Sequence, residues 1–342
     1  MSAESVTEAL TEQDLERLQG KVDDLRAEIS KVIIGQASAV EQLLVGLFAG
    51  GHCLLEGVPG LAKTLMIRTL GQAVELSFKR IQFTPDLMPS DIIGTEILEE
   101  DHGTGHRAFR FNRGPIFANL VLADEINRSP PKTQAALLEA MQEQEVTYGG
   151  ETYVLDRPFF VLATQNPIEQ TGTYPLPEAQ LDRFLLNLRI EYPSLEEEMS
   201  ILTATTGAAA DAVRAVMSAE DVRRIQALVR QVHVSNGLVE WVARLVRASR
   251  PASSEVESVG DLVDWGAGPR AGQALILTAK ARALLSGRFA VSQEDLESLV
   301  GPVFRHRILV NFKGQAEGIT SDEIARRILE AVGPPRSPLE PQ

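Results

Sequence analysis

A glycine-rich segment, Gly57-Val58-Pro59-Gly60-Leu61-Ala62-Lys63-Thr64, constrains the fold of this chain more than any other part of its sequence. It follows an apolar run, Cys53-Leu54-Leu55, that predicts a short strand, and a helix is expected after it. Glycines let a phosphate approach the N–H groups at the positive end of a helix, where Lys63 can neutralise β- and γ-oxygens and Thr64 can bind Mg²⁺. The segment therefore predicts a phosphate-binding loop, although a turn that only joins a strand to a helix would use similar residues.

Ala62 stands where such loops usually carry a second glycine. Alanine fits well if residue 62 already has helical backbone angles, because it then favours the start of the helix. The predicted nucleotide-binding residues of this segment are Gly57, Pro59, Gly60, Leu61, Ala62, Lys63, Thr64 and Leu65.

Apolar runs at 120–123 and 159–163 predict two further strands that are buried on both faces, as in a parallel sheet covered by helices. An amphipathic helix is expected at 40–48, ended by Gly50-Gly51. A second helix over 135–141 is expected to have Ser129 as its cap and Pro130 in its first position. This alternation of strands and helices indicates an α/β domain over residues 15–193.

The segment from 84 to 115 interrupts the alternation, because it is rich in proline and glycine. Its pieces around 95–98 and 108–111 alternate in the manner of a β-hairpin. We interpret residues 94–117 as a hairpin inserted into the α/β domain.

Residues 194–332 are predicted to form an all-helical domain. Ser194-x-x-Glu197, Ser218-x-x-Asp221 and Ser292-x-x-Asp295 each have the hydroxyl and the acidic residue of a helix start. Two weaker stretches, 203–211 and 250–268, are expected to break this domain. The end segments 1–14 and 333–342 are predicted to be disordered.

Asp124 and Glu125 follow the apolar run 120–123. Beside a phosphate loop, the first carboxylate can hold Mg²⁺ together with Thr64, and the second can polarise an attacking water. An acidic pair in this position can also begin a solvated loop. Asn166 follows the next buried run on a strand expected to neighbour the other two, and it can orient the same water or simply begin an Asn-Pro turn.

Composition narrows the class of protein. The chain has 342 residues, of which 44% are apolar and 23% charged, which is typical of a globular protein of two domains or one large domain. Its 33 basic and 47 acidic residues give a net charge of −14, which disfavours binding along a nucleic-acid backbone. A single cysteine, no pattern of a signal peptide and no apolar run long enough for a membrane span predict a cytoplasmic location without membrane insertion.

Five ordered motifs resemble those of the MoxR family of AAA+ ATPases. The resemblance spans roughly residues 15–330, and an alanine before the lysine of the phosphate loop is in keeping with the family. The motifs are Val32-Ile33-Ile34-Gly35-Gln36, the phosphate loop, Leu122-Ala123-Asp124-Glu125-Ile126-Asn127-Arg128, Ala163-Thr164-Gln165-Asn166-Pro167 and Pro177-Glu178-Ala179-Gln180-Leu181-Asp182-Arg183-Phe184.

The resemblance implies a role for each matching residue. Ile34 and Gly35 would border the adenine of ATP. Asp124 and Glu125 would be the metal-side and catalytic carboxylates, and Asn166 would be the polar sensor of the γ-phosphate.

Two arginines match family residues that lie outside the phosphate pocket. Arg183 matches an arginine finger that acts on the nucleotide of an adjacent subunit. Arg270 matches a second sensor at the start of a lid helix, and the resemblance leaves open whether it serves its own or a neighbouring nucleotide. The inserted hairpin resembles the insertion found in this branch of AAA+ proteins.

The function implied by the resemblance is that of an ATP-hydrolysing remodelling motor with ATP and Mg²⁺ as cofactors. It implies a homo-oligomeric, hexameric ring that acts like a chaperone on protein partners, among them proteins with von Willebrand factor A domains. Alternatives on the same fold are the motor subunit of a metal chelatase or a nucleic-acid translocase. A phosphotransferase and a nucleotide-binding scaffold without turnover are alternatives of another class.

Overall fold

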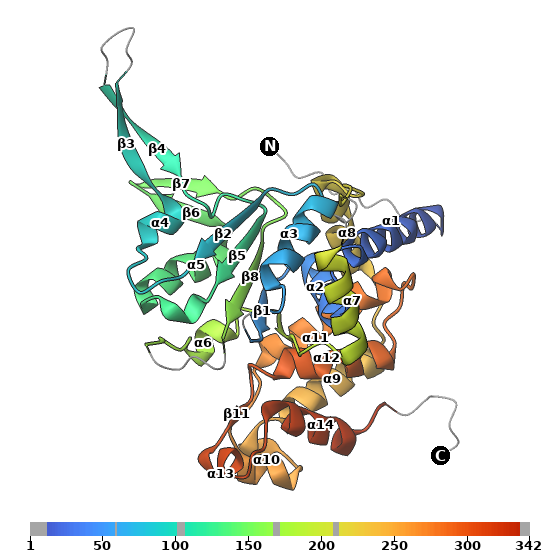
Figure 1. Ribbon diagram of the computed structural model, residues 1–342. Helices are drawn as coiled ribbons and strands as arrows, with labels where there is room; N and C mark the ends of the chain where they lie inside the picture. The colour runs from blue at the N-terminus through green and yellow to red at the C-terminus, as the bar shows by residue number, and fades with distance from the viewer. Residues whose placement is uncertain (1–11, 59, 101–106, 167–171, 208–211, 336–342) are drawn as a thin grey trace.

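The computed structural model describes residues 12–58, 60–100, 107–166, 172–207 and 212–335. Figure 1 shows an α/β core that carries a projecting hairpin, with a group of helices packed below one edge of the core sheet. Within the described residues, no helix combines the length and the apolar character needed to cross a membrane.

The centre of the core is a parallel five-stranded sheet with the strand order β2-β5-β8-β1-β9. Its strands are β1 (Cys53–Glu56), β2 (Phe78–Gln82), β5 (Leu120–Asp124), β8 (Phe160–Gln165) and β9 (Leu186–Arg189). All five residues of β5 are buried, and alternate side chains enter two separate apolar clusters on the two faces of the sheet. The predicted parallel sheet is confirmed, and β8 does lie between β1 and β5.

Helices cover both faces of this sheet. The core helices are α1 (Glu12–Ser30), α2 (Ala37–Ala49), α3 (Lys63–Ala73), α4 (Pro89–Ile93), α5 (Pro131–Glu143), α6 (Glu178–Leu181) and a 3-10 turn (Ile126–Arg128). Gly50 ends α2 in the left-handed conformation with φ 72°, as the glycine pair predicts. The described chain enters α1 at Glu12, within the segment 1–14 that was predicted to be disordered; residues 1–11 lie outside the described residues.

The predicted start of α5 is wrong by one residue. Pro130 occupies the N-cap position and Pro131 the first helical position, where the missing N–H costs no hydrogen bond. Ser129 is extended and ends the preceding 3-10 turn, so its hydroxyl does not cap α5.

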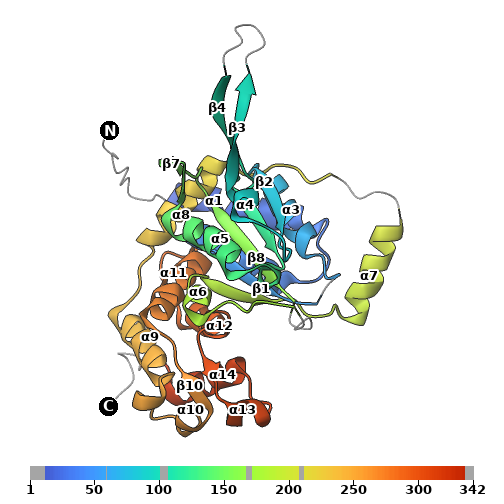
Figure 2. The same cartoon turned by 90° about the vertical axis from the view of Figure 1, so that its left-hand side faces the viewer.

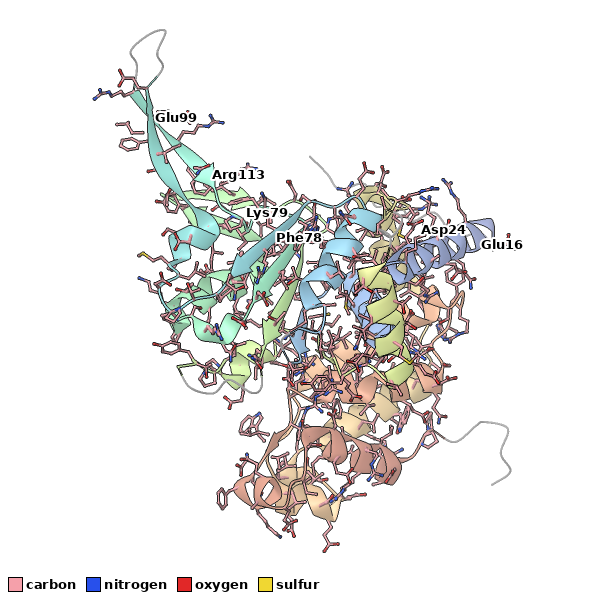
Figure 3. All side chains as sticks on the ribbon, in the orientation of Figure 1. Glu16, Asp24, Phe78, Lys79, Glu99 and Arg113 are labelled. Atoms are coloured by element: carbon pink, nitrogen blue, oxygen red, sulfur yellow. The ribbon has the colours of Figure 1, made fainter. Side chains whose placement is uncertain are left out.

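The predicted hairpin is formed by β3 (Gly94–Glu100) and β4 (Arg107–Arg113), which pair antiparallel. It extends away from the core, with Arg113 at its base and Glu99 further out (Figures 1 and 3). Gly94 has φ 112°, and a Cβ at this position would lie 2.1 Å from the carbonyl oxygen of Asn112. Glycine is therefore required where the hairpin leaves the core.

A second hairpin, β6 (Glu145–Tyr148) with β7 (Glu151–Val154), supports the first and was not predicted. The ring of Phe111 stacks on Tyr153 at 4.5 Å and on Tyr148 at 5.2 Å, measured between ring centroids. These stacked rings connect the projecting hairpin to the second one.

We expect Phe111→Ala to loosen the projecting hairpin while the core stays folded. Loss of the stacked rings removes about 0.5–1.5 kcal/mol per aromatic pair beyond area burial, so amide exchange in β3 and β4 should accelerate roughly tenfold. Hydrogen exchange followed by mass spectrometry measures this. Phe109→Ala is the matched control, since Phe109 lies two residues away on β4 and is 73% exposed. Equal acceleration in both variants would contradict the role of the rings.

The carboxyl-terminal half is mainly helical. Its helices are α7 (Leu195–Thr206), α8 (Ala219–Gln231), α9 (Asn236–Ala248), a 3-10 turn (Pro251–Ser253), α10 (Glu257–Leu262), α11 (Pro269–Leu285), α12 (Gln293–Phe304), α13 (Phe312–Ala316) and α14 (Ser321–Val332). Ser194, Ser218 and Ser292 each accept from the predicted third residue of their helix and form a complete capping box.

The prediction of an all-helical domain is wrong in one respect. Strands β10 (Val263–Trp265) and β11 (Leu309–Val310) pair antiparallel where two connections between helices cross. The backbone N–H and C=O groups of these connections lie outside the helices, and pairing of the two short strands gives them hydrogen-bond partners. A search for helical periodicity does not detect such short strands. The predicted break at 203–211 begins only after Thr206, and residues 208–211 lie outside the described part, as do residues 336–342 of the predicted tail.

Candidate nucleotide site

The glycine-rich segment forms a loop between β1 and α3, at the carboxyl end of the sheet where open α/β folds bind ligands. A Cβ at Gly57 would lie 3.2 Å from both Cβ and the carbonyl oxygen of Ile190, so glycine gives the loop its close fit against the chain after β9. Gly60 has φ 88°, in the left-handed region. Pro59 lies outside the described residues.

Ala62 does not have the helical backbone angles under which alanine would fit best. This residue is the N-cap of α3 with φ 55° and ψ 21°, a left-handed conformation that costs a non-glycine residue about 1–2 kcal/mol. The usual glycine of this loop would adopt it without strain. The tight turn from the loop into α3 therefore determines the backbone conformation of Ala62, although alanine prefers helical angles.

We expect Ala62→Gly to keep nucleotide affinity and Ala62→Val to reduce it about tenfold or more. Glycine accepts positive φ, whereas a β-branched side chain is strongly disfavoured there and would displace the loop. Titration calorimetry with ATP compares the variants, and circular dichroism shows whether each is folded. Equal affinity for the valine and glycine variants would contradict the left-handed conformation.

Lys63 begins α3, and its side chain points back into the loop. Its Nζ donates to the carbonyl oxygen of Gly57 at 2.5 Å. Burial lowers the pKa of Lys63, and the nearby charges of Asp124 and Glu125 act in the opposite direction. The amine is thus held beside the two predicted carboxylates.

The carboxylate of Asp124 accepts hydrogen bonds on both of its oxygens. Thr164 donates to Oδ1 at 2.6 Å, and Arg80 donates to Oδ2 from Nη2 at 2.6 Å and from Nε at 3.0 Å. Arg80 was not predicted as a site residue, because the charged residues of β2 make this strand hard to recognise in the sequence. Only the pairing of β2 with β5 brings the Arg80 side chain to Asp124. Arg80 holds the predicted metal ligand on the side that faces β2.

Glu125 is held by three neighbours. Its N–H donates to Thr164 Oγ1 at 2.9 Å, and its Oε2 accepts from Gln82 Nε2 at 2.8 Å. The guanidinium of Arg128 forms an ion pair with Oε2 at 3.0 Å. Gln82 is the last residue of β2 and pairs with Asp124 of β5. Its polar side chain at the end of a strand was the sequence signal by which Gln82 could have been identified as a site residue.

Asn166 directly follows β8, which pairs with β5 on one side and β1 on the other. The carboxyl ends of three adjacent strands therefore bring together Asn166, the phosphate loop and the pair Asp124-Glu125. Asn166 is buried, with 6% of its surface exposed, so its side chain has a defined environment. The predicted phosphate-side residues that the structure describes all lie at one edge of the sheet.

The segment predicted to border the adenine lies near α7. Gly35 has φ 70°, and a Cβ there would lie 2.9 Å from Glu197 Cδ. Gln36 also has a left-handed conformation, and its Nε2 donates to the carbonyl oxygen of Glu191 at 2.7 Å. Ile34 is half-buried beside them. One side of this segment is thus covered by the chain that enters α7.

The two predicted arginines lie on a different surface. Arg183 and Arg270 line a cavity of about 260 Å³ together with Asp182 and Arg307, which we call the arginine cavity. Asp182 lies 2.8 Å from Arg307 Nε and 3.8 Å from Arg270 Nη1, and Arg183 donates to the carbonyl oxygen of Leu138 at 2.9 Å. Among the described residues that line this cavity, none belongs to the phosphate loop.

The side chains at the phosphate edge suit a nucleotide with a hard divalent cation. Thr64 and Asp124 offer oxygen ligands, which Mg²⁺ prefers, and Mg²⁺ usually completes its shell with phosphate oxygens and water. Within the described residues there is no cluster of three or more His, Cys, Asp or Glu side chains that would bind a metal without such a ligand. The donor set therefore fits Mg²⁺ carried by a phosphate.

Comparisons with known proteins agree with this geometry. A family model described as "ATPase family associated with various cellular activities (AAA)" matches residues 52–186, and an AAA lid model matches residues 257–328. The chain is 44% identical to the chaperone MoxR1 of Mycobacterium tuberculosis, over 92% of this chain and 82% of that protein. It is 30% identical to the protein MoxR of Paracoccus denitrificans, over 84% of this chain and 88% of that one.

A solved structure shows the same fold. The crystal structure of a presumed ATPase from Cytophaga hutchinsonii matches with a TM-score of 0.88 at 42% identity, over 95% of this chain and 98% of that one. The sheet, the phosphate loop and the lid thus define an ATPase of the AAA class. Within that class, the chain belongs to the MoxR family of AAA+ ATPases.

Proposed function

We propose that this chain hydrolyses ATP as a homo-oligomeric ring, hexameric by analogy with AAA+ proteins, and uses the reaction to remodel partner proteins. The separation of two sets of residues carries the proposal: the phosphate-side residues lie at the sheet edge, and the two arginines line a cavity elsewhere. Figure 2 shows α3 and α7 toward one side of the molecule and α5 and α11 toward the other. A closed site would then need residues from two copies.

Each phosphate-side residue has a defined task in this proposal. Lys63 would exchange its bond to the Gly57 carbonyl for bonds to phosphate oxygens. Thr64 and Asp124 would hold Mg²⁺, which supplies stabilisation of the charge on the transferred phosphate. Glu125 would polarise the attacking water, and Asn166 would orient it.

The two arginines would act on the nucleotide of the neighbouring copy. Arg183 would stabilise transition-state charge, and Arg270 shares its cavity, so we assign both residues to the same neighbouring nucleotide. The contact between Arg183 and the Leu138 carbonyl would be given up when the two copies close.

Protein partners, von Willebrand factor A domain proteins among them, remain a prediction from the family resemblance. The relative from Mycobacterium tuberculosis is named a chaperone, which supports this class of activity. Motion of the helical part against the core would be the useful output of hydrolysis. A cytoplasmic location likewise remains a prediction from the sequence.

The experiment that tests the proposal measures phosphate release per subunit against protein concentration, with sizing in the presence and absence of ATP. We expect turnover to rise as the oligomer forms. Turnover that stays constant down to a fully monomeric sample would exclude a shared site. Tight ATP binding without phosphate release would favour a scaffold without turnover.

Lys63→Ala is expected to abolish measurable nucleotide binding. The change removes charge-assisted hydrogen bonds worth about 1.5–3 kcal/mol each, so two of them account for an affinity loss of at least roughly a hundredfold. Calorimetry with ATP measures it. Lys79→Ala is the matched control, because Lys79 is an exposed lysine on β2 (Figure 3). Near-normal affinity of the Lys63 variant would rule out the phosphate-loop assignment.

A further inference from the structure

Helix α7 presents an apolar stripe that no part of the described chain covers. Leu195, Met199 and Leu202 follow one another at helical spacing and are 75%, 60% and 58% exposed. Glu198 lies on the same side, and neither it nor Glu196 forms an ion pair with the described residues. An amphipathic helix with its apolar side in water is typical of an interface.

A groove on the helical part is lined by positively charged side chains, whereas α7 carries glutamates. It lies between α9 and α11, has a volume of about 740 Å³, and has an apolar floor that includes Val242, Val246, Ile276 and Leu277. Its cationic rim consists of Arg230, Arg247, Arg250 and Lys280. Within the described part of the chain, none of these four cations pairs with a carboxylate. We call this surface the α9–α11 groove.

The apolar stripe of α7 lies near the nucleotide half of the proposed shared site, and the α9–α11 groove lies near its arginine half. Glu197 of α7 packs against Gly35, which belongs to the segment predicted to border the adenine. The α9–α11 groove adjoins the arginine cavity, because Gln273 and Leu277 line both. Figure 2 shows α7 and the pair α9 and α11 on opposite sides of the molecule, so they face each other only between copies.

We propose that α7 of one copy docks in the α9–α11 groove of its neighbour. The inference rests on the proposed function, since it assumes that the copy holding the nucleotide meets the copy that provides the arginines. The apolar stripe of α7 would cover the apolar floor, and its unpaired glutamates would meet the cationic rim. A contact between two different surfaces of identical chains repeats head to tail, which is the geometry that builds a ring.

Disulfide trapping tests this contact directly. Cys53, the one cysteine of the sequence, is buried, and burial raises the pKa of its thiol, so introduced cysteines would be the reactive ones. Met199→Cys on α7 is mixed with Ala243→Cys in the groove, with ATP and a mild oxidant. We expect a covalent dimer of the two variants. Ala204→Cys, at an exposed position on the opposite side of α7, is the matched control and should not cross-link to Ala243→Cys.

Assembly measurements give a second readout that does not depend on activity. Leu202→Glu should raise the concentration needed for ATP-dependent assembly at least tenfold in sedimentation, whereas Leu202→Met should leave it within twofold. Assembly of the wild type should also weaken with salt, because the contact pairs opposite charges.

Two results would overturn the docking inference for different reasons. If the wild type assembles with concentration-dependent turnover, but Met199→Cys traps no more dimer than Ala204→Cys and Leu202→Glu assembles normally, the ring uses another surface and the proposed function stands. If the wild type does not assemble with ATP at any concentration, both the docking contact and the shared site are wrong.

Discussion

Arg183→Ala is expected to bind ATP with near wild-type affinity and to lose about 10³- to 10⁵-fold in turnover, as an arginine finger supplied by a neighbour does. The physical reason is its position: Arg183 lies in the arginine cavity, which is not lined by phosphate-loop residues among those the structure describes. Arg270→Ala should show the same combination of retained binding and reduced turnover. Titration calorimetry and phosphate release measure the two quantities separately.

Mixing two inactive variants decides whether the arginine acts across a boundary. Lys63→Ala offers an intact finger without a usable pocket, and Arg183→Ala offers an intact pocket without a finger. We expect the mixture to regain a measurable part of the activity when sizing shows that both co-assemble. Co-assembly without any activity would mean that Arg183 acts within its own chain or that turnover needs several intact boundaries. Mixtures of each variant with wild-type protein separate these two cases, because activity is proportional to the wild-type fraction in the first case and depends on it more steeply in the second.

Glu125→Gln is expected to keep ATP affinity within a few-fold and to slow phosphate release by about 10²- to 10⁴-fold. An amide cannot accept the proton of the attacking water, and general-base contributions are of this size. The change is nearly isosteric, and glutamine can still accept from Gln82 and from Arg128, so the loop after β5 should keep its conformation. Calorimetry and a single-turnover assay measure the two effects.

Glu145→Gln is a suitable control for that variant, since it makes the same change at an exposed position at the start of β6. It should leave phosphate release unchanged. Phosphate release by Glu125→Gln at the wild-type rate would show that another group accepts the proton.

Interactions close in sequence were predicted well. The three Ser-x-x-Asp/Glu motifs at Ser194, Ser218 and Ser292 all became capping boxes, because donor and acceptor lie within one turn of the same helix. The glycine end of α2 and the strands of the projecting hairpin also follow from local spacing.

Edge strands and charged strands were harder to predict. β2 carries Lys79 and Arg80, so it lacks the apolar run that identifies β5 and β8 (Figure 3). With β2 unidentified, the contacts of Arg80 with Asp124 and of Gln82 with Glu125 could not be foreseen. Both contacts depend on pairing between strands that are about forty residues apart, as the register of β2 and β5 shows.

The sequence by itself determined the phosphate loop, the carboxylate pair and the alternation that builds an α/β core followed by helices. These features depend on residue types within a few positions of one another. Tertiary structure decided the left-handed backbone of Ala62, because the loop must turn tightly between β1 and α3 against the local preference of alanine. It also decided that Arg183 and Arg270, 87 residues apart in the sequence, line one cavity, since only packing of the helical part against the core brings them together.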